Sequence, residues 1–152
     1  MSKEKYFELI DNLCDECQIR EPQTLYETCD LVVLGIAFTI LYHEDTECVV
    51  VFCDFGAAPE ENRSLVLRRL LEANMFTLNF FAPCFAFNPE TEHVLLRAHF
   101  PLEGLTAQEL LNMLGTHAAM AAEWRRTHFL TDMPAWNDAS LPETPEAPRP
   151  NA

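Results

Sequence analysis

The chain has 152 residues, of which 24 are Asp or Glu and 10 are Lys or Arg, so its formal net charge is -14. This length predicts one domain, and an apolar fraction of 49% is enough to build a buried core. Nucleic acid and anionic membranes are poor partners for such a chain, because phosphate groups are bound mainly by Lys and Arg. The charge instead favours solubility and suits a basic partner.

Neither a secretory signal nor a membrane span is expected. Residues 1–13 alternate charged with apolar side chains and lack the continuous apolar run of a signal peptide. No apolar run approaches the roughly 20 residues that cross a bilayer. We therefore expect a cytoplasmic protein whose six cysteines are reduced thiols.

The first predicted element is a helix over residues 3–19, which ends before Pro22. Its apolar positions recur at helical spacing, with acids on the opposite side. These positions are Phe7, Ile10, Leu13, Cys14 and Cys17.

Three strands are predicted next, over residues 31–34, 36–43 and 48–55. Both faces of these strands are apolar, whereas an antiparallel sheet with one wet face should alternate apolar and polar side chains. Something is therefore expected to cover the second face: a helix, a second subunit or a bound partner.

A central helix is predicted to open at Pro59, Glu60 and Glu61 and to run to residue 76, because proline and acids suit the first helical turn. Its apolar stripes predict two contact surfaces. One stripe is Leu67, Leu71 and Asn74, and the other is Val66, Leu70 and Ala73.

Two further strands, over residues 84–87 and 93–100, flank the turn-rich segment NPETE. The last helix is predicted to begin with a capping box formed by Thr106 and Glu109. One face of this helix is apolar apart from a histidine: Leu110, Met113, Leu114, His117, Met120, Ala121 and Trp124.

The composition changes near residue 130, and the remaining tail holds five of the ten prolines and the isolated aromatic Trp136. We expect residues 1–129 to form one domain and residues 130–152 to be a disordered, Pro-rich acidic tail. The predicted order is α-β-β-β-α-β-β-α. The fold class is therefore α+β with antiparallel strands, because the hairpin linkers are too short for parallel crossovers.

The sequence offers no catalytic, metal or cofactor motif. Cys14 and Cys17 have the spacing of a redox motif, but the neighbouring acids raise a thiol pKa, so packing at the core is the better interpretation. A zinc site would need two more ligands, and the other cysteines and the histidines are scattered.

Residues 75–87 read MFTLNFFAPCFAF, with five phenylalanines and no charge. Such a segment is either core or a surface for another protein. Pro83 divides it, so that its first part ends the central helix and its last part begins a strand.

Several motifs follow one another in a recognisable order. They are the apolar first helix, Phe55-Gly56 followed by Pro59, LLEANMF at residues 70–76, the hairpin that leads into PLEGL, and AAEWRR at residues 121–126. This order resembles the CesT/Tir-chaperone family, the class I chaperones of bacterial type III secretion. The resemblance covers roughly residues 3–128 and leaves out the tail.

The resemblance implies a small acidic homodimer in the bacterial cytoplasm, with a role in virulence. Such chaperones bind the N-terminal segment of a cognate secreted effector, keep it soluble and export-competent, and use no nucleotide or other cofactor. The effector wraps around the dimer, fills apolar patches and in some cases adds a strand to the sheet. Components of the secretion apparatus are further candidate partners.

Carried over by position, the resemblance assigns two surfaces. Effector-binding patches would be formed by the first helix and the first three strands: Phe7, Ile10, Val33, Phe38, Ile40, Val49 and Val51. The dimer interface would be formed by the central helix and the strand after it: Leu67, Leu71, Met75, Phe76, Phe85 and Phe87.

Two alternative functions stay open at this point. A scaffold of the same fold would bind a partner unrelated to secretion. A thiol or metal protein would use Cys14 and Cys17.

Overall fold

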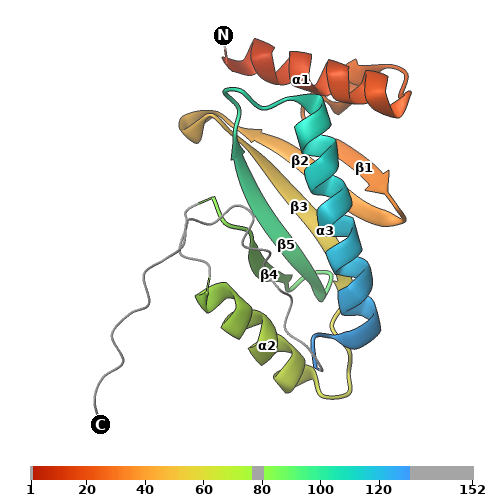
Figure 1. Ribbon diagram of the computed structural model, residues 1–152, viewed down its shortest axis with the longest axis vertical. Helices are drawn as coiled ribbons and strands as arrows, with labels where there is room; N and C mark the ends of the chain where they lie inside the picture. Colours follow the sequence, from red (N-terminus) through yellow and green to blue (C-terminus); the bar gives the residue numbers. More distant parts are fainter. Residues whose placement is uncertain (1, 77–80, 131–152) are drawn as a thin grey trace.

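A computed structural model describes residues 2–76 and 81–130 of the protein. In chain order, its main elements are α1 (Ser2–Cys17), β1 (Cys29–Val33), β2 (Ile36–His43), β3 (Cys48–Ala57), α2 (Arg63–Met75), β4 (Cys84–Asn88), β5 (His93–Pro101) and α3 (Ala107–Thr127). This order confirms the predicted α+β class (Figure 1). Of the predicted tail, Leu130 is described, and the rest, with Trp136, lies outside the described residues.

The five strands form one antiparallel sheet in the order β1-β2-β3-β5-β4, so β1 and β4 are its edges. Leu34 and Gly35 join β1 to β2, with Val33 paired to Ile36. Both turn residues have positive φ, 51° and 78°. This is the geometry of a type I′ hairpin turn, whose twist matches that of the strands it joins.

The central helix begins later than the sequence predicts. Pro59, Glu60 and Glu61 precede α2, which starts at Arg63, directly after Asn62. Asn62 has a φ of 57°, a left-handed conformation that asparagine tolerates better than most residues. Because this conformation interrupts right-handed helical backbone, the helix does not extend back to Pro59.

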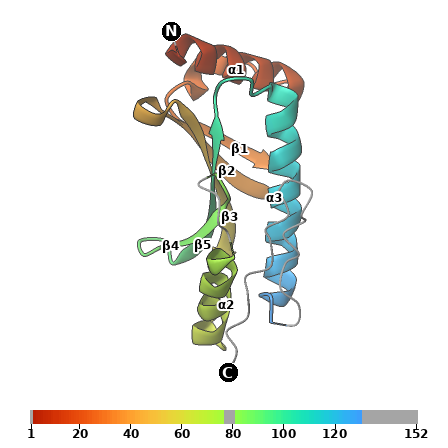
Figure 2. The same ribbon diagram turned by 60° about the vertical axis from the view of Figure 1, so that its left-hand side comes forward.

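Helices α1 and α3 lie over the same face of the sheet (Figures 1 and 2). Alternate residues of the strands point toward these helices and define the core face, and the residues between them define the open face. The buried core-face residues of β2 and β3 are Ile36, Phe38, Ile40, Val49, Val51, Cys53 and Phe55. The predicted apolar face of α3 meets them through Leu110, Leu114, His117, Ala121 and Trp124.

Arg125 of α3 binds the end of β3 beside Gly56. Gly56 lies at a β-bulge with a φ of 102°, and a Cβ there would lie 3.3 Å from the Arg125 Nε atom. Arg125 donates hydrogen bonds to the carbonyl oxygens of Phe55 at 2.8 Å and Asp54 at 3.1 Å. The Phe55-Gly56 and AAEWRR motifs are therefore partners in space.

Asn74 of α2 closes the β4 edge of the sheet. Its Nδ2 atom donates to the Phe85 carbonyl oxygen at 3.0 Å, and its Oδ1 atom accepts from the Phe85 N–H at 2.7 Å. Three apolar side chains of the same helix are buried in the hydrophobic core: Val66, Leu70 and Ala73. At this position α2 supplies the hydrogen bonds that another strand would make.

Buried His117 gives the fold a defined pH dependence. Burial lowers the pKa of its imidazole to about 4, so the side chain is neutral in the folded protein at pH 7. The unfolded chain takes up this proton near pH 6.5, so protonation favours unfolding between about pH 6.5 and pH 4.

Between pH 7 and pH 4.5, the free energy of unfolding of the wild type should fall by about 2 kcal/mol more than that of His117→Leu. Urea unfolding at the two pH values measures this difference, because carboxylates common to both proteins cancel. Equal losses in both proteins would contradict the prediction.

Candidate protein-binding surfaces

Five of the seven residues predicted to contact an effector lie in the core of the protomer. Ile10, Phe38, Ile40, Val49 and Val51 are between 0% and 2% exposed. They lie between the core face of the sheet and the helices that cover it. The structure therefore corrects their placement from surface to core, because strand alternation puts them on the covered face.

Phe7 and Val33 are packed against the core but keep part of their surface exposed. Phe7 of α1 stacks on Tyr26, with ring centroids 4.2 Å apart. The Tyr26 hydroxyl donates a hydrogen bond to the Asp11 carboxylate at 2.6 Å, which holds the loop after α1 against the helix. Contact of Phe7 and Val33 with an effector stays a prediction.

Most of the residues predicted for the dimer interface are accessible. Leu71, Met75 and Phe76 are 69%, 76% and 71% exposed, Phe87 is partly exposed and Leu67 is half-buried. Together these five residues form the α2 patch, an apolar surface near the β4 edge. Its role in self-association stays a prediction.

Phe85 differs from the other predicted interface residues because it is buried. Its ring packs edge-on against Phe55 at 5.2 Å and against Phe129 at 6.2 Å between centroids. Phe85 therefore belongs to the protomer core, whereas Phe87, at the end of the same strand, stays accessible and lies 5.4 Å from the Arg63 guanidinium.

The β1–β2 turn is a surface that sequence reasoning missed. Val32 and Leu34 are 73% and 80% exposed. The left-handed φ of Leu34 costs about 1 kcal/mol that Asn or Gly at this position would avoid. A Leu-Gly pair in place of the usual Asn-Gly was the signal available in the sequence.

One row of backbone groups on β1 has no strand partner in the described part of the chain. A two-residue hairpin turn is flanked by a hydrogen-bonded pair, here Val33 with Ile36. Because bonded and non-bonded pairs alternate, the N–H and C=O groups of Asp30 and Val32 point away from β2. The outer edge of β1 is therefore free to pair with an extended polypeptide.

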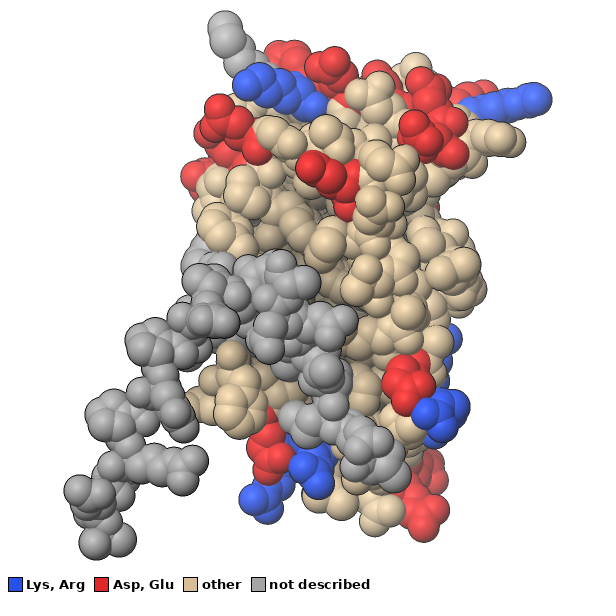
Figure 3. Space-filling model, viewed as in Figure 1, with Lys and Arg blue, Asp and Glu red and all other residues tan. Residues whose placement is uncertain are grey.

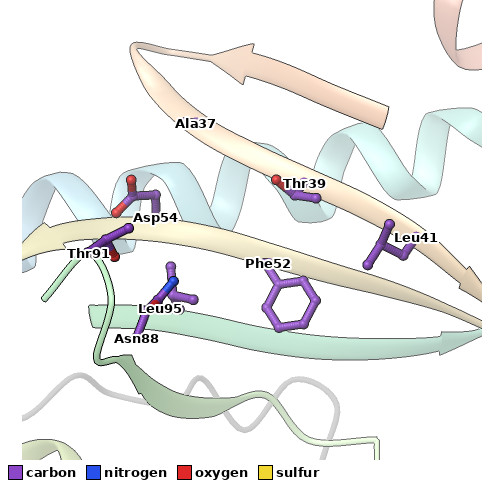
Figure 4. Close-up of a pocket in the computed structure, with 8 residues that line it drawn as sticks. All are labelled: Ala37, Thr39, Leu41, Phe52, Asp54, Asn88, Thr91 and Leu95. Carbon is purple, nitrogen blue, oxygen red and sulfur yellow. The ribbon is translucent and has the colours of Figure 1, made fainter. Parts of the chain in front are cut away.

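The open face of the sheet contains a shallow hollow, with α3 on the far side of the sheet (Figure 4). Four apolar and four polar residues of the strands and the β4–β5 turn line it: Ala37, Thr39, Leu41, Phe52, Asp54, Asn88, Thr91 and Leu95.

Acidic side chains gather at the α1 end of the face shown in Figure 3. On the open face the strands carry two carboxylates, and each has a local partner. The Thr39 hydroxyl donates to Asp30 at 2.7 Å, and His93 Nδ1 lies 3.0 Å from an Asp54 oxygen. Asp54 lines the hollow, and Asp30 lies on the edge strand β1.

One cationic side chain, Arg97, lies on the open face in spite of the net charge of the chain. It lies opposite Phe52 on one side and Cys84 on the other. Burial lowers the pKa of His99, and Arg97 and His43 lower it further by repulsion.

Four of the six cysteines have a raised thiol pKa. Burial is the main factor that raises the pKa of Cys14 and of Cys17, and adjacent acids add to the effect. Burial likewise raises the pKa of Cys29 and Cys53 to about 12. These values favour packing over nucleophilic or redox chemistry.

Two further findings concern residues 2–76 and 81–130. No group of three or more His, Cys, Asp or Glu side chains is arranged there to hold a metal ion. No helix in those ranges is long and apolar enough to cross a membrane.

Residues 8–125 match the Tir chaperone protein (CesT) family, from α1 to the last turn of α3. The chain therefore belongs to this family, and its class is that of the type III secretion chaperones. A search of curated proteins finds no match.

Solved structures share the fold at low sequence identity. A chain of the ExsC-ExsE complex superimposes with a TM-score of 0.69 at 18% identity, covering 88% of this chain and 97% of the other. A chain of the HopA1-SchA chaperone-effector complex superimposes with a TM-score of 0.63 at 14% identity, covering 83% of this chain and 97% of the other. A chain of the ExoT-SpcS complex from Pseudomonas aeruginosa superimposes with a TM-score of 0.58 at 20% identity, covering 78% of this chain and 96% of the other.

Phe38→Asp should destabilise the protein by about 3 kcal/mol or more, because it places a carboxylate in the core. Ala37→Asp adds the same charge one residue away on the open face and should cost less than about 1 kcal/mol. Urea unfolding compares the two variants. A Phe38→Asp protein of normal stability that loses only effector binding would return Phe38 to the binding surface.

Proposed function

We propose that this chaperone binds the N-terminal segment of a cognate effector in the bacterial cytoplasm and keeps it soluble and export-competent. Membership of the Tir chaperone protein (CesT) family supports the proposal. A similar solved structure, HopA1-SchA, is a chaperone-effector complex. The observation that carries the proposal is the free edge of β1 beside exposed apolar side chains.

An effector strand would pair with the backbone groups of Asp30 and Val32. Its side chains would alternate, so that one set meets Val33 on the core-face side and the other set meets Val32 on the open side. Main-chain hydrogen bonds to β1 would hold the segment extended, because backbone groups paired with β1 are not available for a helix or hairpin of the effector itself.

We also propose that the α2 patch is covered by the α2 patch of a second copy, in a two-fold symmetric dimer. Charged residues are rare in the centre of such interfaces, and the patch consists of Leu, Met and Phe side chains. The patch lies near the β4 edge, and β1 is the opposite edge of the sheet. A dimer formed in this way would leave both β1 edges accessible to effector. Contact with components of the secretion apparatus stays a prediction.

Val32→Pro should weaken binding of a co-expressed effector about tenfold or more, because it removes the outward N–H and leaves a carbonyl of the effector unpaired. The N–H of Val32 makes no bond to β2, so the fold should be retained, as proline is tolerated on edge strands. Isothermal titration of the purified effector fragment measures the affinity, and unfolding in urea measures the stability.

Val33→Pro is the matched control, because the Val33 N–H bonds to β2 inside the sheet. It should lower stability by about 1–3 kcal/mol. If Val32→Pro binds the effector as tightly as the wild type, the segment does not pair with β1.

Leu71→Glu should convert the dimer into monomers, because it would bury a charge in an apolar contact. Ala122→Glu adds the same charge to the exposed side of α3 and should leave the dimer intact. Sedimentation at about tens of micromolar, the range in which stable dimers persist, distinguishes the two. A dimeric Leu71→Glu protein would place the interface elsewhere.

Affinity purification from the native cytoplasm, followed by mass spectrometry, identifies the partner. Recovery of a type III effector, and its loss from the secreted fraction when the chaperone gene is deleted, would support the proposal. Recovery of a partner that is never secreted would favour the alternative of a scaffold of the same fold.

A further inference from the structure

The open face of the sheet continues directly from the free edge of β1. Val32 pairs with Ala37 of β2, so both side chains project on the open side. Ala37 lines the hollow, and Phe52 and Leu95 lie further across it on β3 and β5 (Figure 4). The hollow therefore extends from the strand next to the free edge to the middle of the sheet, and its lining combines apolar Ala37, Phe52 and Leu95 with polar side chains such as Asp54.

Arg97 lies beside this hollow on β5. It is paired across the sheet with Phe52 and is two residues from Leu95 on β5. Within the described ranges its guanidinium forms no ion pair, although the chain carries 24 acidic residues. The carboxylates of Asp30 and Asp54 on the same face are held by Thr39 and His93.

We propose that the open face binds the stretch of effector next to the segment paired with β1. One bulky aliphatic or aromatic side chain enters the hollow beside Phe52, and one Asp or Glu side chain pairs with Arg97. This inference rests on the proposed function, because the occupant is a continuation of the same client.

The shape of the hollow favours a polypeptide over an enclosed small molecule. Its volume is about 380 Å³, and it is shallow and open to solvent. Such a hollow accepts one or two side chains of a segment that lies across the sheet.

Charge favours an acidic client segment at this place. The chain as a whole repels acids, with a net charge of -14, so Arg97 is a local exception where a carboxylate is attracted. A two-fold contact between open faces would bring two Arg97 side chains together only where the axis passes beside them, so sedimentation of Arg97→Glu tests this alternative. An acidic residue near a bulky apolar one would fix the register of the client.

The test is a selection of random displayed peptides of about 12 residues, long enough to cross the sheet, on the full chain. Wild-type protein should enrich peptides in which a bulky apolar residue lies near an Asp or Glu. Arg97→Glu should enrich Lys and Arg instead, and it should bind peptides selected on the wild type about tenfold more weakly. Ala37→Phe, which fills the hollow from an exposed position, should weaken the same peptides by a similar factor.

Arg20→Glu is the matched control for charge. It makes the same reversal at an exposed position outside the sheet, and it should change peptide affinity by less than about twofold. The proposal is overturned if the selected peptides show no acidic preference, if Arg20→Glu and Arg97→Glu weaken binding equally, or if no peptide is enriched.

The remaining outcomes separate this inference from the proposed function. If Val32→Pro abolishes effector binding while Arg97→Glu and Ala37→Phe do not affect it, the strand pairing stands and the open face is not a client site. If Arg97→Glu changes the mass in sedimentation but not peptide binding, a second copy covers the face and the proposal fails.

Discussion

A β-sheet has two faces and two edges, and each must be buried, hydrogen-bonded or left for a partner. In this chain α1 and α3 bury one face, and Asn74 of α2 supplies hydrogen bonds to one edge. The other face and the other edge meet at Val32 of β1. The binding surfaces all depend on this division, because the covered half of the sheet provides the stability that allows the other half to stay exposed.

The free β1 edge recognises the extended conformation of a partner chain more than its side chains. Backbone N–H and C=O groups on β1 pair with any extended chain, so affinity from this source is largely independent of sequence. Specificity must then come from side-chain pockets and from charge. The net charge of -14 disfavours random association through exposed apolar residues, and Arg97 is one position on the open face that attracts a carboxylate.

The parts of the fold that depend on local sequence could be predicted from the sequence. The capping box of Thr106 and Glu109 and the apolar face of α3 are set by neighbours within a few residues, and both are present in the structure. The choice of faces could not be predicted in the same way. Phe38 and Ala37 lie on adjacent positions of an apolar strand, and which of them is buried depends on where a helix about 70 residues later lies. The exposure of Leu34 likewise depends on the turn that it forms with Gly35, and the late start of α2 depends on the left-handed backbone of Asn62.

The amide of Asn74 has a consequence for the behaviour of the protein at high concentration. A sheet with two free edges can accept one molecule on each side, and repetition of that step produces a fibre. Here the β4 edge is occupied at Phe85 by a side chain of the same molecule, which opposes the addition of a strand at that residue. Two copies that paired through their β1 edges would present only their β4 edges outward, so this contact closes into a pair and does not propagate.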